Sequence, residues 1–356
     1  MSELRQILDL WKRAGAAGSA DRAAEEICLA TVVAIEGSAY RRPGARMLLT
    51  ASGQRAGTIS GGCLEAEVAK KAWWLTEKGP SLQRYSSFFD DDGDMPYGLG
   101  CGGTVIVLLQ RGEPAAEALE ALRRSTEDRT SSVIVTSTAT DFPGTTVILN
   151  AAGEALYSNT PDPDPALTAL ATEALKTGKS RHASDHFIEV VAPPPAIFIF
   201  GAGDDTQPLA DFAWSLGWHV TVADNRSNLA REARFPRAAR VGNLDTALAH
   251  IGPADAAVIM THSYEQDRKI LRALLERDLK YVGVLGPRRR TERLISEIAA
   301  ELPLTAEECL ARLHTPVGLD LGGHSPAAIA LAIAAELQAV FAGREARKLS
   351  SPALHA

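Results

Sequence analysis

The stretch AIFIFGAGDDT, Ala196–Thr206, decides the fold of the second half of this chain. AIFIF is a short continuous apolar run, which is typical of a parallel strand that is buried on both faces. GAG follows it, and a helix is predicted from about Thr206 to Leu216. Further strands are predicted at His219–Ala223, Ala256–Met260 and Lys280–Leu285. This regular alternation predicts an α/β fold, a Rossmann-like doubly wound parallel sheet.

The GAG turn also suggests a nucleotide site. Gly201 and Gly203 match the first two glycines of G-x-G-x-x-G, whereas Thr206 stands at the third position. Asp224 ends the second strand, where an acidic residue binds a ribose hydroxyl. Asp204 and Asp205 would repel a phosphate at the helix start, or one of them simply caps the helix. Both readings stay open.

The first half is predicted to be a second α/β domain. Runs rich in β-branched residues predict its strands, and apolar residues at helical spacing predict its helices. The strands are Cys28–Ile35, Arg46–Thr50, Thr104–Leu109, Ser132–Ser137 and Thr145–Leu149, and the helices are Leu64–Thr76, Pro114–Arg124 and Pro165–Thr177. Asp90–Gly103, acidic and then glycine-rich, is interpreted as a functional loop.

Three consecutive prolines predict the boundary between the halves. They close the segment Ala192–Pro195 and can join neither a helix nor a central strand. We expect an N-terminal domain over 1–191, a linker over 192–195, a Rossmann-like domain over 196–345 and a tail over 346–356.

Composition limits the function classes. The chain has 356 residues, a net charge of −7 and four scattered cysteines without a CxxC pair. The acidic balance argues against non-specific nucleic-acid binding, and the cysteine spacing fits a reducing compartment. The N-terminal segment has helical spacing rather than the pattern of a signal peptide, and no apolar run is long enough to span a membrane. We expect a cytoplasmic protein.

The segment GSAYRRPGARM, Gly37–Met47, is the strongest candidate binding loop. Arg41, Arg42 and Arg46 lie among glycines and a proline between two predicted strands. Guanidinium groups bind phosphate or carboxylate through paired hydrogen bonds, so this loop is predicted to hold an anion. The alternative is that Arg41 and Arg42 are solvated or pair with the acidic residues 90–94.

Two cysteines lie in glycine-rich surroundings. Cys63 follows Gly61 and Gly62 at a predicted helix start, which would favour its thiolate, and Cys101 lies within GLGCGG. Either is a candidate sulfur carrier or soft-metal ligand, or else a small buried apolar residue. Cys28 and Cys309 are expected to be core residues.

Other candidates follow strands of the predicted parallel sheet. His262, in THSYEQD, is a candidate base or ligand that Asp267 would orient or cap, or else an ordinary hydrogen-bonded loop histidine. GPRRR, Gly286–Arg290, is a basic turn that suits phosphate or opens a helix onto solvent. Asp320 and His324 lie in a glycine-rich loop before the apolar helix Pro326–Phe341 and suggest the edge of a site.

Taken together, the motifs RRPGARM, ISGGCLE, GLGCGG, FGAG, ADNR, MTHSYEQD, YVGVLGPRRR and PVGLDLGGHSPAAIALAIAAE resemble the xanthine dehydrogenase accessory factor family, XdhC/CoxI. The resemblance covers nearly the full chain. It implies a cytoplasmic accessory protein that binds molybdenum cofactor, as molybdopterin or its cytosine dinucleotide. It also implies two partners, a cysteine desulfurase for sulfuration and an apo molybdenum hydroxylase as recipient, and we expect a homodimer.

On this resemblance, the arginine loop would hold the cofactor's phosphate, and Cys63 or Cys101 would contact molybdenum or relay sulfur. The chain departs from the family at Asp204, where many members have a histidine. Two other functions stay open: an NAD(P)-dependent oxidoreductase using the Rossmann-like domain, and a cysteine-dependent sulfurtransferase.

Overall fold

The computed structural model describes residues 2–16, 25–62, 64–86, 103–161 and 165–350. The chain divides into two compact units, Glu3–Pro194 and Pro195–Ala356, the latter together with the first two residues. The division falls at the end of the predicted proline linker. The domain limits given above stay predictions, because compactness alone does not establish a domain.

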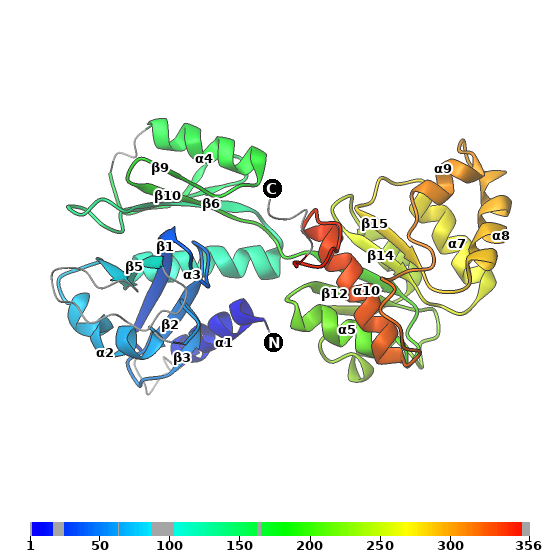
Figure 1. The fold of residues 1–356 in the computed structure, drawn as a ribbon, viewed down its shortest axis with the longest axis horizontal. Coiled ribbons are helices and arrows are strands. Elements are labelled where there is room, and N and C mark those ends of the chain that lie inside the picture. Colours follow the sequence, from blue (N-terminus) through cyan, green and yellow to red (C-terminus); the bar gives the residue numbers. More distant parts are fainter. Residues whose placement is uncertain (1, 17–24, 63, 87–102, 162–164, 351–356) are drawn as a thin grey trace. The chain divides into compact units, whose positions relative to one another are not determined.

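The first unit contains two antiparallel sheets (Figure 1). One has the order β3-β2-β1-β5-β4, and its strands are β1 Ile27–Gly37, β2 Arg46–Thr50, β3 Arg55–Gly57, β4 Ser81–Ser86 and β5 Gly103–Arg111. The other has the order β8-β7-β6-β10-β9, and its strands are β6 Ser132–Ser137, β7 Thr146–Asn150, β8 Ala155–Ser158, β9 Arg181–Ala183 and β10 His186–Val191.

Among the described residues of this unit, four α-helices cover the sheets, namely α1 Glu3–Ala16, α2 Glu65–Leu75, α3 Glu113–Arg123 and α4 Pro165–Thr177. Figure 1 shows α3 between the two sheets and α4 on the far face of the sheet that contains β6. Apolar side chains of α1 and α3 form a common core with both sheets, while α2 and α4 each cover an outer face. A π-helical turn, η1 (Arg124–Asp128), extends α3.

The second unit contains one parallel sheet with the order β13-β12-β11-β14-β15, which confirms the predicted Rossmann-like fold. Its strands are β11 Ala196–Phe200, β12 His219–Ala223, β13 Arg240–Gly242, β14 Ala256–Ile259 and β15 Tyr281–Val284. Its helices are α5 Thr206–Ser215, α6 Leu244–His250, α7 Tyr264–Leu275, α8 Arg288–Ala299, α9 Ala306–Ala311 and α10 Pro326–Phe341, with a 3₁₀ turn, η2, at Glu232–Arg234.

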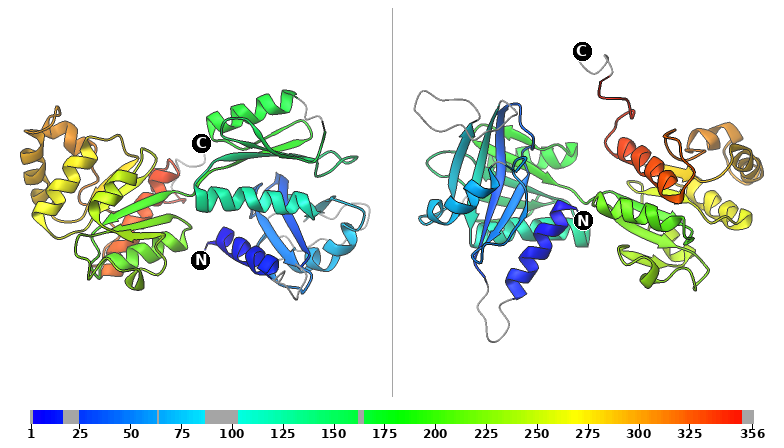
Figure 2. Two further views of the ribbon diagram at one scale, coloured as in Figure 1. Left: turned by 180° about the vertical axis from the view of Figure 1, so that it is seen from behind. Right: turned by 60° about the horizontal axis from the view of Figure 1, so that its bottom comes forward.

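Helices cover both faces of this sheet. The side chains of α5 and α10 pack on one face, and these two helices lie side by side in Figures 1 and 2. The side chains of α6, α7, α8 and α9 pack on the other face. Within the described residues, no helix is long and apolar enough to cross a bilayer.

Candidate functional site

The arginine loop connects β1 to β2 in the first unit. Gly44 adopts a φ of +94°, and its amide donates to the carbonyl of Val32 at 2.8 Å. A Cβ at Gly44 would lie 2.9 Å from the Oε1 atom of Glu189, which belongs to β10 of the other sheet. Glycine at this position therefore allows a carboxylate to approach the loop closely.

That carboxylate binds Arg46. The Nη1 atom of Arg46 donates to Oε1 of Glu189 at 2.7 Å, and Nη2 donates to Oε2. The two side chains are only 6% and 12% exposed, so this is a buried bidentate ion pair that joins the two sheets. The sequence predicted that Arg46 binds an anionic ligand. In the structure, both Nη atoms of its guanidinium bind Glu189, because β2 and β10, which are far apart in the sequence, belong to sheets that meet here.

Arg41 is also paired inside the unit. Its guanidinium donates to Glu3, the first residue of α1, and the hydroxyl of Thr58 donates to the other carboxylate oxygen of Glu3. Glu3 thus ties the arginine loop to the segment that leads into Gly61 and Gly62. The acidic residues 90–94, which the sequence offered as partners of Arg41 and Arg42, lie outside the described residues.

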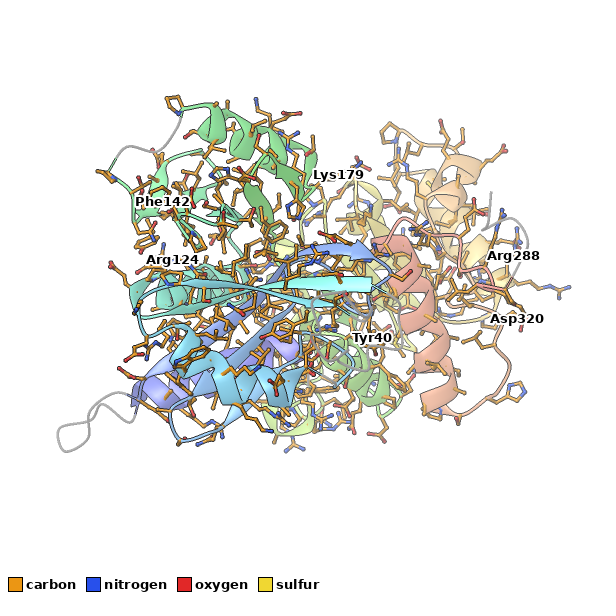
Figure 3. All side chains as sticks on the ribbon, turned by 60° about the vertical axis from the view of Figure 1, so that its left-hand side comes forward. Tyr40, Arg124, Phe142, Lys179, Arg288 and Asp320 are labelled. Carbon is orange, nitrogen blue, oxygen red and sulfur yellow. The ribbon has the colours of Figure 1, made fainter. Side chains whose placement is uncertain are left out.

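Arg42 differs from its two neighbours. It is exposed and forms no side-chain hydrogen bond or ion pair with any described residue. Tyr40 is 74% exposed (Figure 3), and a Cβ on Gly61 would lie 3.8 Å from its ring. A Cβ on Gly62 would meet no described atom within 4 Å. We name Tyr40, Arg42, Gly61 and Gly62 the arginine–glycine face.

A buried carboxylate holds the glycine segment of this face. Glu65 accepts hydrogen bonds from the amides of Ile59 at 3.0 Å and Ser60 at 2.8 Å, and from the Ser60 hydroxyl at 2.7 Å. The Ser60 Oγ in turn accepts from the amides of Gly62 and Leu64, both at 3.2 Å. Burial alone would raise the pKa of Glu65, but these hydrogen bonds outweigh it, and the pKa lies below its ordinary range.

Sequence reasoning missed Ser60 and Glu65. An acidic residue in the first helical turn after a glycine pair was the available signal. Cys63 and Cys101 lie outside the described residues, so their predicted roles stay predictions. Cys28 and Cys309 are buried, as expected, and burial raises the pKa of the Cys28 thiol to about 11.

In the second unit, the GAG turn passes close to the neighbouring strand. Gly201 has a φ of +124°, and a Cβ there would lie 2.3 Å from the carbonyl oxygen of Met260. Thr206, in place of the third glycine, is buried, and its hydroxyl donates to the carbonyl of Gly201 at 3.1 Å. At Gly203 a Cβ would lie 2.5 Å from the Asp205 carboxylate. The turn is therefore built for close backbone packing.

Both carboxylate oxygens of Asp224 accept hydrogen bonds from within the second unit. Asp224 accepts from the amide of Ala202 at 2.9 Å, from the amide of Arg226 at 2.8 Å and from the Arg226 guanidinium, and its side chain is fully buried. Burial alone would raise its pKa, but these bonds outweigh it and lower the pKa. Asp224 thus differs from the ribose-binding carboxylate that the sequence predicted, because both its oxygens already have donors.

The two aspartates of the turn were expected either to repel a phosphate or to cap the helix, and instead each has a side-chain partner. Asp204 pairs with Arg234 at 2.5 Å, and Asp205 Oδ2 lies 2.7 Å from Nε2 of His262. Asp205 occupies the N-cap position of α5 without a side-chain capping bond. Arg234 therefore offsets the charge of Asp204, while Asp205 is held by a hydrogen bond to His262.

Asp267 does not orient His262. It is buried, accepts from the Thr261 hydroxyl and pairs at 2.6 Å with Arg290, the last residue of the GPRRR turn. Arg288 pairs with Glu292 at 2.9 Å on the exposed surface of α8. Asp320 and His324 are exposed in their loop. Within the described residues, no cluster of three or more His, Cys, Asp or Glu is arranged to hold a metal ion.

Comparison with known families gives two matches. Residues 20–86 match the XdhC and CoxI family, and residues 197–337 match the XdhC Rossmann domain. Together these matches include the arginine loop, the glycine pair, the GAG turn and His262.

Several proteins are similar over nearly their full length. A Bacillus subtilis protein named as a probable subunit of xanthine dehydrogenase is 32% identical, over 88% of this chain and 92% of that protein. The molybdenum cofactor insertion chaperone PaoD of Escherichia coli is 25% identical, over 88% of this chain and 82% of that protein. A crystal structure described as a xanthine dehydrogenase from Bacillus halodurans has a TM-score of 0.77 and 29% identity, and covers 99% of this chain and 98% of that chain.

Proposed function

Because this chain belongs to the XdhC and CoxI family, we propose that it binds molybdenum cofactor and assists its insertion into a molybdenum hydroxylase. The similarity to a protein named as a molybdenum cofactor insertion chaperone supports this role. On this proposal the chain is an accessory protein that works in the cytoplasm, and its partners are an apo molybdenum hydroxylase and a cysteine desulfurase. A homodimer is the proposed assembly.

The observation that carries the proposal is that Arg42 is exposed and its side chain pairs with no described residue, in the loop whose Tyr40 lies beside Gly61. Molybdopterin ends in a phosphate, and its dinucleotide form contains a pyrophosphate. Arg41 and Arg46 are neutralised by Glu3 and Glu189, whereas Arg42 has no acidic partner among the described residues. Among the described residues, the face therefore offers a guanidinium without a partner and an exposed glycine backbone, which fit an anionic group.

Equilibrium binding of anaerobically released molybdenum cofactor, followed by elemental analysis for molybdenum, tests this assignment. We expect Arg42→Ala to weaken binding roughly tenfold or more, since a charge-assisted hydrogen bond contributes about 1.5–3 kcal/mol. Arg55→Ala is the matched control, because Arg55 is exposed in the same unit and its side chain also forms no hydrogen bond or ion pair with a described residue. Equal affinity of both variants would remove Arg42 from the site.

A sulfur-carrying thiol is the second part of the proposal. We propose that Cys63 or Cys101 accepts sulfur from the persulfide of a cysteine desulfurase and presents it to the cofactor. The thiolate attacks the outer sulfur, a new S–S bond forms, and the donor leaves as a thiolate. Mass spectrometry of tryptic peptides after incubation with the desulfurase and cysteine should show a gain of one sulfur atom on Cys63 or Cys101.

The buried cysteines serve as internal controls. Burial raises the pKa of Cys28 and of Cys309, so both peptides should remain unmodified in the same sample. Modification of all four cysteines would indicate unspecific chemistry. Absence of any adduct would restrict the proposal to cofactor binding.

A further inference from the structure

A cleft of about 300 Å³ lies in the first unit, where α1, the arginine loop, the end of α3 and β10 meet. Its apolar wall consists of Leu4 and Ile7 of α1, Leu122 of α3 and Val191 of β10. Ligand pockets of this size are at the lower end of the range in proteins. The cleft therefore suits a molecule of one or two rings rather than a dinucleotide.

Two ion pairs form the polar side of the cleft. They join Arg41 to Glu3 and Arg46 to Glu189, and all four side chains line the cleft. Two guanidinium groups and two carboxylates have no net charge. A charged ligand would lose its hydration here without gaining an unpaired counter-charge, which is unfavourable. The cleft therefore favours a neutral ligand over the anion that the sequence predicted for this loop.

Two buried donors in the same side chains lack an acceptor. The Nε atoms of Arg41 and Arg46 are buried and have no hydrogen-bond partner among the described residues. Arg46 as a whole is only 7% exposed. A buried donor without a partner costs about 1–3 kcal/mol, and native proteins contain few of them. Since both arginines line the cleft, a ligand that carries an acceptor can supply what these donors lack.

The carboxylates provide the complementary groups. The two oxygens of Glu189 accept from Arg46, and those of Glu3 accept from Arg41 and Thr58. A carboxylate oxygen has two lone pairs, so it can accept a further N–H from a ligand. The polar side of the cleft thus matches a molecule that presents an N–H donor beside a carbonyl acceptor. A lactam has this arrangement.

We propose that this cleft binds a neutral bicyclic lactam ring, of the kind that pterins and oxopurines share. The ring would lie against Leu4, Ile7 and Leu122, with its lactam edge toward the two ion pairs. Molybdopterin contains a pterin, so for that ligand the inference rests on the proposed function and adds a site for the ring to the one for the phosphate. Arg42 does not line the cleft, so the two sites can be tested separately.

Calorimetry of the full chain with 6-hydroxymethylpterin and with hypoxanthine distinguishes the two sources of the ring. The matched analogues are 2,4-diamino-6-hydroxymethylpteridine and purine, which lack the lactam. We expect at least one lactam to bind about tenfold or more tightly than its analogue, because a hydrogen bond to a charged group contributes about 1.5–3 kcal/mol. Absence of binding by both lactams, or equal binding within both pairs, would overturn the proposal.

Ala192→Leu places the ligand in the cleft. Ala192 is exposed and lines the cleft, so a larger side chain there should weaken binding of the lactam about tenfold or more and leave the urea midpoint of unfolding unchanged. Ala155→Leu is the matched control, because Ala155 is exposed in β8 of the same unit and does not line the cleft. Equal affinity of the two variants would also overturn the proposal.

Neither lactam probe carries a phosphate, so these measurements do not depend on the role proposed for Arg42. A protein that binds a lactam but not the complete molybdenum cofactor would contradict the proposed function and support this inference. A protein that binds the cofactor through Arg42 but neither lactam would contradict this inference alone.

Discussion

The arginine loop of the first unit and the acidic GAG turn of the second unit have similar sequence patterns, since each gathers like charges among glycines. In both, distant residues neutralise most of these charges. Glu189 lies 143 positions from Arg46, and Arg234 lies 30 positions from Asp204. The two differ in which residues have distant partners: in the arginine loop Arg42 has no side-chain partner among the described residues, whereas both aspartates of the GAG turn have one. The comparison teaches that a cluster of like charges in the sequence does not by itself indicate a binding site, because partners distant in the sequence can neutralise it.

The largest effect on the free energy of unfolding is expected from removing one partner of the buried ion pair between Arg46 and Glu189. Glu189→Leu leaves the Arg46 charge without its partner in an environment where the two side chains are 6% and 12% exposed. We expect a loss of about 3–5 kcal/mol in the free energy of unfolding, measured by urea denaturation of the full chain. The double variant with Glu189→Leu and Arg46→Met should recover most of the lost free energy of unfolding, because no unpaired buried charge remains. A loss below about 1 kcal/mol would contradict the assignment of a structural pair.

The equivalent change beside the acidic turn is Asp224→Asn, since Asp224 follows β12 and accepts a hydrogen bond from the Ala202 amide of the turn. The amide keeps the shape of the side chain but loses the charge that holds Arg226, so we expect a loss of about 2 kcal/mol at neutral pH. Arg237→Gln, which weakens an exposed pair with Asp211 in the same unit, serves as the control and should have little effect. Similar unfolding midpoints for the two variants would argue against an internal role for Asp224.

The pH dependence of the Asp224 variant provides a separate test. Its folded-state pKa is lowered, so its stabilising contribution is complete above the unfolded-state pKa and is lost as the pH falls through the folded value. The difference in melting temperature between wild type and Asp224→Asn should therefore be constant near neutrality and shrink below about pH 4. A difference that grows on acidification would contradict the lowered pKa.

The smallest effect on the free energy of unfolding is expected from substituting Arg42. Its exposed side chain forms no bond with a described residue, so Arg42→Ala should change the free energy of unfolding by less than about 0.5 kcal/mol. The urea midpoint of this variant should match that of wild type even where cofactor binding is reduced. A destabilisation as large as that of Glu189→Leu would place Arg42 among the structural arginines.

Much of the fold could be predicted from sequence. The predicted strands Ala196–Phe200 and His219–Ala223 coincide with β11 and β12, and the apolar helix Pro326–Phe341 coincides with α10. Each has a strong apolar pattern along its own length. The strands β3 and β8 were not predicted, because they are short, lie at sheet edges and are largely exposed, so they carry little apolar signal.

Less of the candidate site could be predicted. Arg41, Arg42 and Arg46 are the same residue type in one loop, and only their surroundings pair two of them with Glu3 and Glu189 and leave Arg42 without a side-chain partner among the described residues. Asp267 was expected to orient His262, yet Asp205 is its partner, because parallel pairing of β11 with β14 brings their following loops together.

The sequence by itself therefore determined the strongly patterned elements, the Rossmann-like order of the second unit and the glycine turns, since periodicity and backbone conformation depend on residues a few positions apart. Only the tertiary structure decided which charges are neutralised and which remain for a ligand. Ion pairs form between groups a few ångströms apart in space, and such distances are set by the packing of sheets rather than by neighbours along the chain.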